Sequence, residues 1–167
     1  MQGIPLNERK RLGALLDDRP QTEVMAMIPQ FSQAETDNFV APPAQIPEAL
    51  GVLMFNMERG VNLLEIQEFL RDCPDIQPFD VILANELDDG CARSGNKNTA
   101  RELAQAFGLN YAWGLEFIEL VNDENAKGFH GNAVFSRWPI RRAGVIRLPE
   151  QYNWYFDRQK RIGARVA

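Results

Sequence analysis

Two short apolar runs separated by an amphipathic segment constrain the fold of this chain more than any other feature. The first run is LGVLMFN, residues 50–56, and the second is FDVILAN, residues 79–85. Between them, Asn62 is a candidate helix cap, and apolar residues then recur with helical spacing at positions 63, 64, 66, 69 and 70. A strand, a helix and a strand within about 35 residues predict a right-handed βαβ unit with two neighbouring parallel strands.

The rest of the chain adds further predicted strands and one more helix to this unit. A helix is expected over residues 99–107, because Gly108 is a typical helix-terminating glycine. Strands are expected over residues 111–120, 132–136 and 144–148, and the final RIGARVA is typical of the start of another strand. This succession of strands and helices predicts an α/β fold.

A proline-rich stretch divides the chain in two. Residues 1–49 contain a predicted helix over residues 7–16, capped by Asn7, and end in APPAQIP. The regular pattern begins only after this stretch. We therefore expect a partly helical N-terminal extension, residues 1–49, followed by an α/β domain, residues 50–167.

Composition predicts a cytoplasmic protein without a membrane span. No apolar run reaches about 18 residues, and the N-terminus lacks an apolar run of signal-peptide length. The two cysteines, Cys73 and Cys91, lack the spacing of a metal site, so reduced thiols are expected.

Charge is unevenly distributed along the chain. The net charge of −5 argues against a protein that coats nucleic acid non-specifically, because such binding depends on Lys and Arg. Residues 131–167 carry eight basic and two acidic residues, a net charge of +6, which leaves −11 for residues 1–130. The basic segment is either a surface that meets phosphate or a solvated rim that pairs with the acidic remainder.

Two polar residues mark the ends of the two predicted parallel strands. Asn56 and Glu86 each stand at the expected carboxyl end of a parallel strand, the edge where open α/β sheets bind ligands. Their hard oxygen atoms suit Mg²⁺, or Mn²⁺, better than zinc. The alternative is that both residues are polar only because the chain leaves the core there.

Four segments resemble the endonuclease/exonuclease/phosphatase family of metal-dependent phosphoesterases, in the order of that family's motifs. They are VLMFNMERG, FDVILANELDDG, GFHGNAVFSRWPI and RQKRIGARVA. The resemblance implies that Asn56 and Glu86 bind Mg²⁺ and that the fold is part of a DNase I-like, four-layer αββα sandwich. The chain stops before the family's Gly-Asp-x-Asn and Ser-Asp-His motifs, so only the N-terminal half of such a domain is expected.

Five further residues are weaker candidates. His130 is expected in a glycine-rich turn, where it either forms a structural hydrogen bond or reaches a substrate phosphate. Arg93 and Asn98 belong to a polar loop that either grips phosphate or forms a solvated turn with a helix cap at Asn98. Glu116 is a candidate for substrate binding, and Asn132 either does the same or fixes the backbone at its strand's start.

The sequence thus predicts a hydrolase, a metal-dependent phosphodiesterase or phosphomonoesterase with a phosphate-ester substrate that includes nucleic acid among the choices. Because the later motifs are missing, this chain alone is expected to be inactive. Two alternatives stay open: a non-catalytic fragment or half-domain, and an α/β module that binds a phosphorylated partner. Half a sandwich is also expected to expose an apolar face and to self-associate through it.

Overall fold

Residues 52–89 form the predicted βαβ unit. The computed structural model describes residues 1–150, 152–156 and 160–167. Within it, β2 (Val52–Arg59) and β3 (Val81–Asp89) pair directly with each other in parallel. The helix α3 (Leu63–Asp72) connects them in the sequence. Asn62 occupies the position before α3, but its side chain makes no capping hydrogen bond there.

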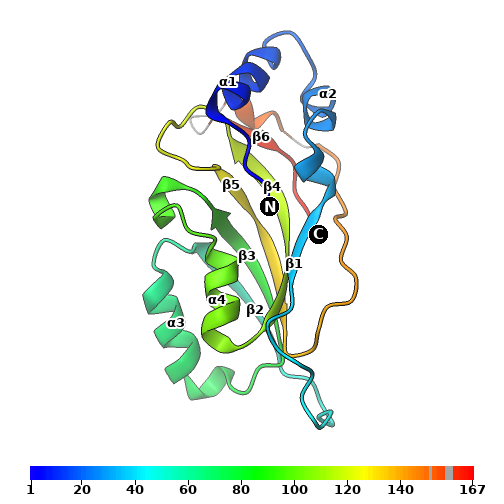
Figure 1. Ribbon diagram of the computed structural model, residues 1–167, viewed down its shortest axis with the longest axis vertical. Helices are drawn as coiled ribbons and strands as arrows, with labels where there is room; N and C mark the ends of the chain where they lie inside the picture. The colour runs from blue at the N-terminus through cyan, green and yellow to red at the C-terminus, as the bar shows by residue number, and fades with distance from the viewer. Residues whose placement is uncertain (151, 157–159) are drawn as a thin grey trace.

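A mixed sheet continues from this unit. Its order is β1-β4-β5-β3-β2, and β6 pairs with the second half of β4, giving six strands in the described part of the chain (Figure 1). Apart from the parallel β2–β3 pair, neighbouring strands are antiparallel. The remaining strands are β1 (Ala34–Asp37), β4 (Asn110–Glu119), β5 (Phe129–Ser136) and β6 (Arg161–Gly163).

One face of the sheet is covered by α3 and α4 (Thr99–Phe107), which lie in front of the strands in Figure 1. Side chains alternate across a strand, so residues such as Met57, Ile82 and Phe135 pack beneath the helices and are almost fully buried. As predicted, α4 ends at Gly108, which adopts the left-handed conformation, and the Asn98 side chain caps its start.

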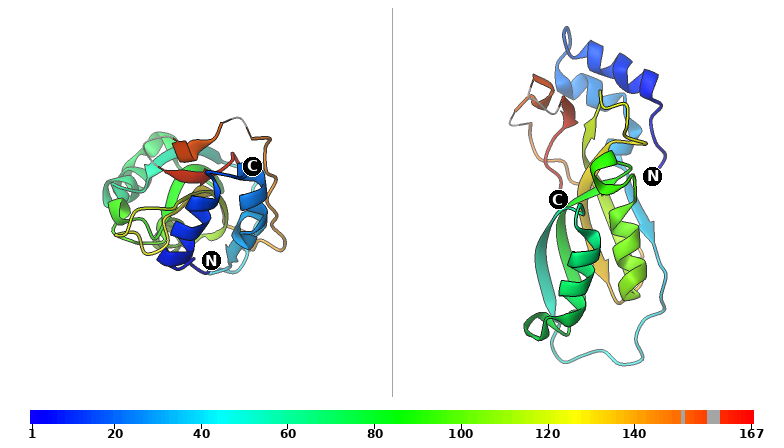
Figure 2. Two further views of the ribbon diagram at one scale, coloured as in Figure 1. Left: turned by 90° about the horizontal axis from the view of Figure 1, so that it is seen from above. Right: turned by 90° about the vertical axis from the view of Figure 1, so that its left-hand side faces the viewer.

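The N-terminal segment packs at one end of the same sheet. Helices α1 (Leu6–Leu15) and α2 (Gln21–Ala26) lie beyond β6, as the two views of Figure 2 show, while β1 adds an edge strand against β4. None of the helices in the described residues has the length and apolarity needed to cross a bilayer. Short 3₁₀ turns occur at Pro29–Ser32, Pro74–Ile76, Ala92–Ser94 and Trp154–Phe156.

No helix of the described residues covers the opposite face of the sheet. Val52, Met54 and Val134 are 57%, 72% and 41% exposed there. A cavity of about 720 Å³ lies between this face and the segments 140–145 and 166–167. We call this surface the open face. Residues 52–55 and 81–84 form continuous apolar runs, the pattern of strands that pack on both faces, whereas helices cover only one face here.

Three further local predictions from the sequence were wrong. Helix α1 begins at Leu6 after Pro5, so Asn7 does not cap it, because the carbonyl of Pro5 already accepts the first helical hydrogen bond, from the N–H of Arg9. Residues 144–148 form no strand and make only an isolated bridge between Arg147 and Val166. Strand β5 begins at Phe129 rather than at Asn132, which places His130 inside the sheet.

Candidate metal-binding site

The two metal-ligand candidates lie on neighbouring parallel strands, as predicted. Asn56 of β2 is in register with Asn85 of β3, the residue immediately before Glu86. Asn56 is exposed, on the same face of β2 as Met54, which places it on the open face. Its Oδ1 accepts a hydrogen bond of 2.9 Å from the backbone N–H of Glu58.

The expectation that both residues end their strands was wrong. Strands β2 and β3 each continue for three residues, to Arg59 and Asp89. The pairing is interrupted next to the candidate residues and then resumes, with Arg59 opposite Leu87. The polar side chains are therefore accommodated at an irregularity within the strands, not where the chain leaves the sheet.

A second irregularity, a β-bulge at Glu86, lies on the other side of β3. Against β5, Ala84 pairs with Ala133 and Leu87 pairs with Gly131, so Asn85 and Glu86 together stand opposite Asn132. Glu86 has a φ of 59°, in the left-handed region that residues other than glycine rarely adopt. Such bulges redirect side chains and are common next to functional sites.

Asn132 contacts this bulge directly. Its Oδ1 accepts a hydrogen bond of 3.2 Å from the backbone N–H of Glu86, and its Nδ2 donates one of 3.2 Å to the carbonyl of Val166. The sequence alternative in which Asn132 fixes the backbone therefore matches the observed contacts. The preceding Gly131 is required by space, since a Cβ there would lie 2.0 Å from the Gly114 carbonyl oxygen.

The sequence reasoning missed Asn85. This residue is exposed, borders the open-face cavity together with Asn132, and lies beside Asn56 across the parallel pair. The sequence did contain a signal for Asn85, because the two apolar runs, residues 50–56 and 79–85, both end in an asparagine. Strand pairing therefore brings the backbones of Asn56, Asn85 and Asn132 next to that of Glu86.

His130 belongs to a buried ionic cluster next to this site. It is 4% exposed, and its Nδ1 lies 2.9 Å from Oδ1 of Asp88, the residue opposite it on β3. Its Nε2 lies 3.9 Å from Oε2 of Glu116, a buried atom without a hydrogen bond among the described residues. The other Glu116 oxygen accepts a hydrogen bond of 3.0 Å from Arg165. Both sequence candidates, His130 and Glu116, are therefore engaged with protein groups.

Arg93 and Asn98 are also engaged internally. Arg93 donates to both carboxylate oxygens of Asp88, at 2.7 and 2.9 Å, and contacts the Glu119 carboxylate. Asn98 combines its cap on α4 with a hydrogen bond of 2.8 Å to Glu35. The loop that carries these residues is thus held to the sheet, and both side chains bind protein groups in this structure.

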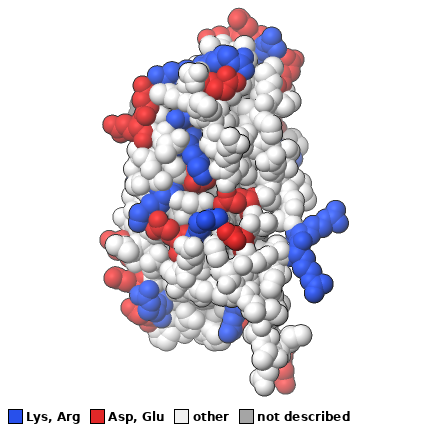
Figure 3. Space-filling model, in the orientation of Figure 1, with Lys and Arg blue, Asp and Glu red and all other residues white. Residues whose placement is uncertain are grey.

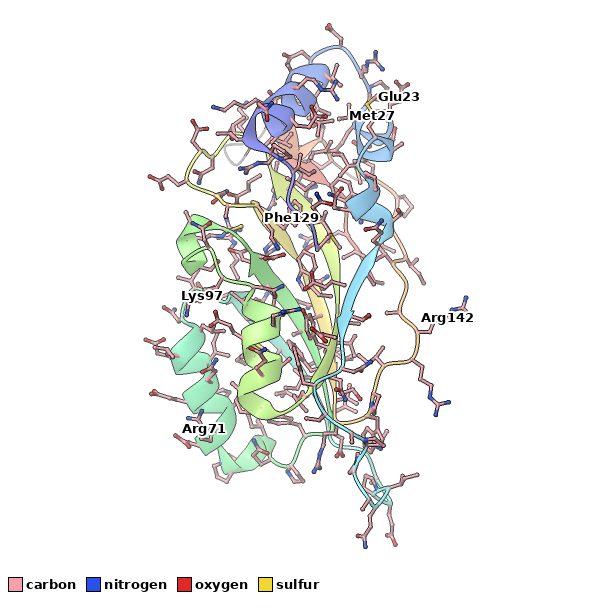
Figure 4. The ribbon with its side chains drawn as sticks, viewed as in Figure 1. Glu23, Met27, Arg71, Lys97, Phe129 and Arg142 are labelled. Atoms are coloured by element: carbon pink, nitrogen blue, oxygen red, sulfur yellow. The ribbon has the colours of Figure 1, made fainter. Side chains whose placement is uncertain are left out.

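The basic residues of the C-terminal segment are largely paired. Arg137 contacts Asp80 at 3.1 Å, and Arg147 donates to three backbone carbonyls at 2.7 Å each. Arg142 instead points away from the body of the molecule (Figure 4). On the face shown in Figure 3, acidic and basic side chains are intermixed, without a single basic patch. This arrangement matches the solvated-rim alternative better than a phosphate-binding surface.

No family model, curated protein or solved structure matches this chain. Among the described residues, no group of three or more His, Cys, Asp and Glu side chains is placed to hold a metal ion. The candidate site accordingly offers one carboxylate, Glu86, and amide oxygens. These oxygen ligands suit a hard cation such as Mg²⁺, which keeps part of its water shell, better than zinc, which favours Cys and His ligands.

The cluster around Asp88 makes stability dependent on pH. Burial alone would raise the pKa of Asp88, but hydrogen bonds with His130 and Arg93 outweigh burial and hold the pKa below its ordinary value of 3.8. The folded state therefore gains stability from the ionised carboxylate. This gain is fully present above about pH 5 and is lost as the pH falls through the pKa of the folded protein.

Comparison with Asp88→Asn tests this pH dependence. The difference in unfolding free energy between the wild type and this variant, from urea titrations, should shrink as the pH is lowered from about 7 to about 3. A difference that stays constant over this range would contradict the assignment.

Proposed function

We propose that this chain contributes the metal-binding part of a divalent-metal-dependent phosphoesterase, in which Asn56 and Glu86 hold Mg²⁺ or Mn²⁺. One observation carries the proposal. The parallel register of β2 and β3 brings Asn56 beside Asn85, and the bulge places Glu86 next to them. The four motifs that resemble the endonuclease/exonuclease/phosphatase family supply the reaction class, hydrolysis of a phosphate ester.

The residues fit such a cation chemically. The amide oxygen of Asn56 accepts one hydrogen bond, from Glu58, and keeps a second lone pair. No described residue donates a hydrogen bond to the Glu86 carboxylate. Mg²⁺ is commonly bound by one or two protein groups together with waters and substrate phosphate, so a site with a single carboxylate is sufficient.

The remaining side chains suit the binding of a phosphate. When bound, Mg²⁺ neutralises charge that develops on the transferred phosphoryl group. The exposed Asn85 amide can donate N–H groups to a phosphate oxygen beside Asn56. His130 is held by Asp88 and is shielded from solvent, so we assign it a structural role in this chain.

Metal binding tests the proposal. Titration with Mn²⁺, followed by electron paramagnetic resonance of the free ion, should show one weak site in the wild type. Asn56→Ala and Glu86→Gln should each weaken binding at least tenfold, about the lower limit seen when supporting groups of a metal site are removed. Asn122→Ala, which changes an exposed turn, is the matched control and should bind as the wild type does. Unchanged affinity in both site variants would exclude this site.

We also propose that the open face is an inner face of the four-layer αββα sandwich implied by the resemblance. Its support is the row of exposed apolar residues opposite the helix-covered face, including Val52, Met54 and Val134. Sheets that pack face to face lie about 10 Å apart and bury such rows against each other. A chain that leaves this face uncovered is expected to self-associate.

Sedimentation velocity tests the self-association. The wild type should form oligomers whose fraction rises with protein concentration, while Val134→Lys should shift the distribution toward monomer, because a charge on this face opposes its burial. A lysine at the exposed position Val121, outside the open-face cavity, serves as the control and should leave association unchanged. A wild type that stays monomeric up to sub-millimolar concentration would contradict the proposal.

A further inference from the structure

Glu86 has a backbone conformation that its own sequence does not favour. Its φ of 59° crowds the Cβ against the backbone, a strain that glycine avoids and that the surrounding structure must support. Something outside β3 must therefore hold this conformation in place.

The contact that does so comes from Asn132 on the next strand. In a bulge the extra residue loses its partner in the backbone ladder. Here the N–H of Glu86 donates instead to Asn132 Oδ1, at 3.2 Å. The other end of the same amide is fixed by its hydrogen bond to Val166, so the acceptor oxygen cannot rotate freely away from Glu86.

The bulge decides where the Glu86 carboxylate can go. In a regular strand, successive side chains point to opposite faces, so Asn85 and Glu86 would be separated by the sheet. Ala84 and Leu87, on either side of the pair, are both buried, whereas Asn85 is exposed and Glu86 is partly exposed. The two residues that oppose Asn132 are thus both kept out of the helix-covered core.

We propose that Asn132 is a positioning residue, which holds Glu86 in the left-handed bulge and thereby keeps its carboxylate beside Asn56 for the cation. The role of the Glu86 carboxylate toward the cation rests on the proposed function. The claim that Asn132 holds the backbone of Glu86 in the bulge does not. Asn132 touches neither the cation nor a reacting atom in this account, and it acts through the backbone of Glu86.

The experiment compares Asn132→Ala with a matched control, Asn38→Ala. The Asn38 amide also joins two chain segments, accepting from the N–H of Ile140 at 2.8 Å and donating to its carbonyl at 3.1 Å. Two quantities are measured for each variant of the full chain. They are the backbone carbon chemical shifts of Glu86, which report its φ and ψ, and the affinity for Mn²⁺.

Asn132→Ala is expected to move the Glu86 shifts out of the left-handed range and to weaken Mn²⁺ binding at least tenfold, about the effect of losing a supporting group. Asn38→Ala should change neither quantity. Asn132→Asp, which keeps the acceptor oxygen for Glu86, should retain the left-handed shifts. Unchanged Glu86 shifts in Asn132→Ala, or an equal loss of affinity in Asn38→Ala, would overturn the inference.

Two further outcomes are decisive. If the wild type binds no Mn²⁺, the proposed function fails, while the Glu86 shifts still decide the positioning role. If Asn132→Ala does not fold, Glu86→Gly is added to it, because glycine adopts a positive φ without support. Restored folding with a retained bulge supports the inference, and failure to restore folding overturns it.

Discussion

Arg93→Ala is expected to lower the free energy of unfolding by about 3 kcal/mol, the lower end of the range for broken buried ion pairs. The variant leaves the Asp88 carboxylate, which is fully buried, without its bidentate partner, and it also removes a contact of Glu119. Burial lowers the pKa of Arg93, but the hydrogen bonds and charge of Asp88 more than offset this and hold that pKa above its ordinary range. The lower end of the range applies because the Arg93 side chain is itself 27% exposed.

Arg101→Ala is the control for this experiment. Arg101 pairs with Asp37, and the two side chains are 48% and 35% exposed, so its loss should cost no more than about 1 kcal/mol. Both variants are compared with the wild type by urea denaturation at pH 7. Equal costs for the two arginines would show that the Asp88 cluster does not stabilise the fold as described.

Hydrolysis of phosphate esters by residues 1–167 alone is expected to be undetectable. The site offers one carboxylate, and His130, the single histidine, is bound to Asp88 and buried. Lack of a positioned general acid or base costs about 10² to 10⁴ in rate, and lack of an electrostatic stabiliser a further 10² to 10³. Assays with bis(p-nitrophenyl) phosphate and single-stranded DNA, with Mg²⁺ or Mn²⁺, measure this directly.

The contrary result would identify other catalytic residues. Robust metal-dependent turnover by this chain would mean that groups assigned structural roles take part in the reaction. Its loss in His130→Ala or Glu116→Gln, but not in Glu86→Ala, would move the site to the buried cluster. A longer protein that supplies a further Asp–His pair is expected to be active and to lose its activity on Glu86→Ala.

The βαβ unit could be predicted because its signals are local. The apolar runs at 50–56 and 79–85, and the helical spacing between them, depend on residues close in sequence. The same holds for α4, whose cap Asn98 and terminating Gly108 were both identified. The parallel pairing followed from the crossover connection between the two strands, which is why Asn56 and Glu86 were expected on neighbouring strands.

The features that could not be predicted are non-local. The bulge at Glu86 depends on pairing with Asn132, which lies 46 residues away. Strand β1 has little apolar signal, and only its pairing with β4 defines it. Asp88, Arg93 and His130 were not recognised as one cluster, because strand pairing brings His130 opposite Asp88 across 42 residues. Sequence spacing carries no information about such contacts without the sheet order.

Crystals of the chain grown with Mn²⁺ would test the central claim most directly. An anomalous difference map should show a peak within about 2.2 Å of both Asn56 Oδ1 and a Glu86 carboxylate oxygen. This is about the bond length between a small divalent cation and an oxygen ligand. The same peak should be absent in crystals of Glu86→Gln. A strong Mn²⁺ peak elsewhere, or an empty site between Asn56 and Glu86 at saturating Mn²⁺, would contradict the assignment of a metal site here.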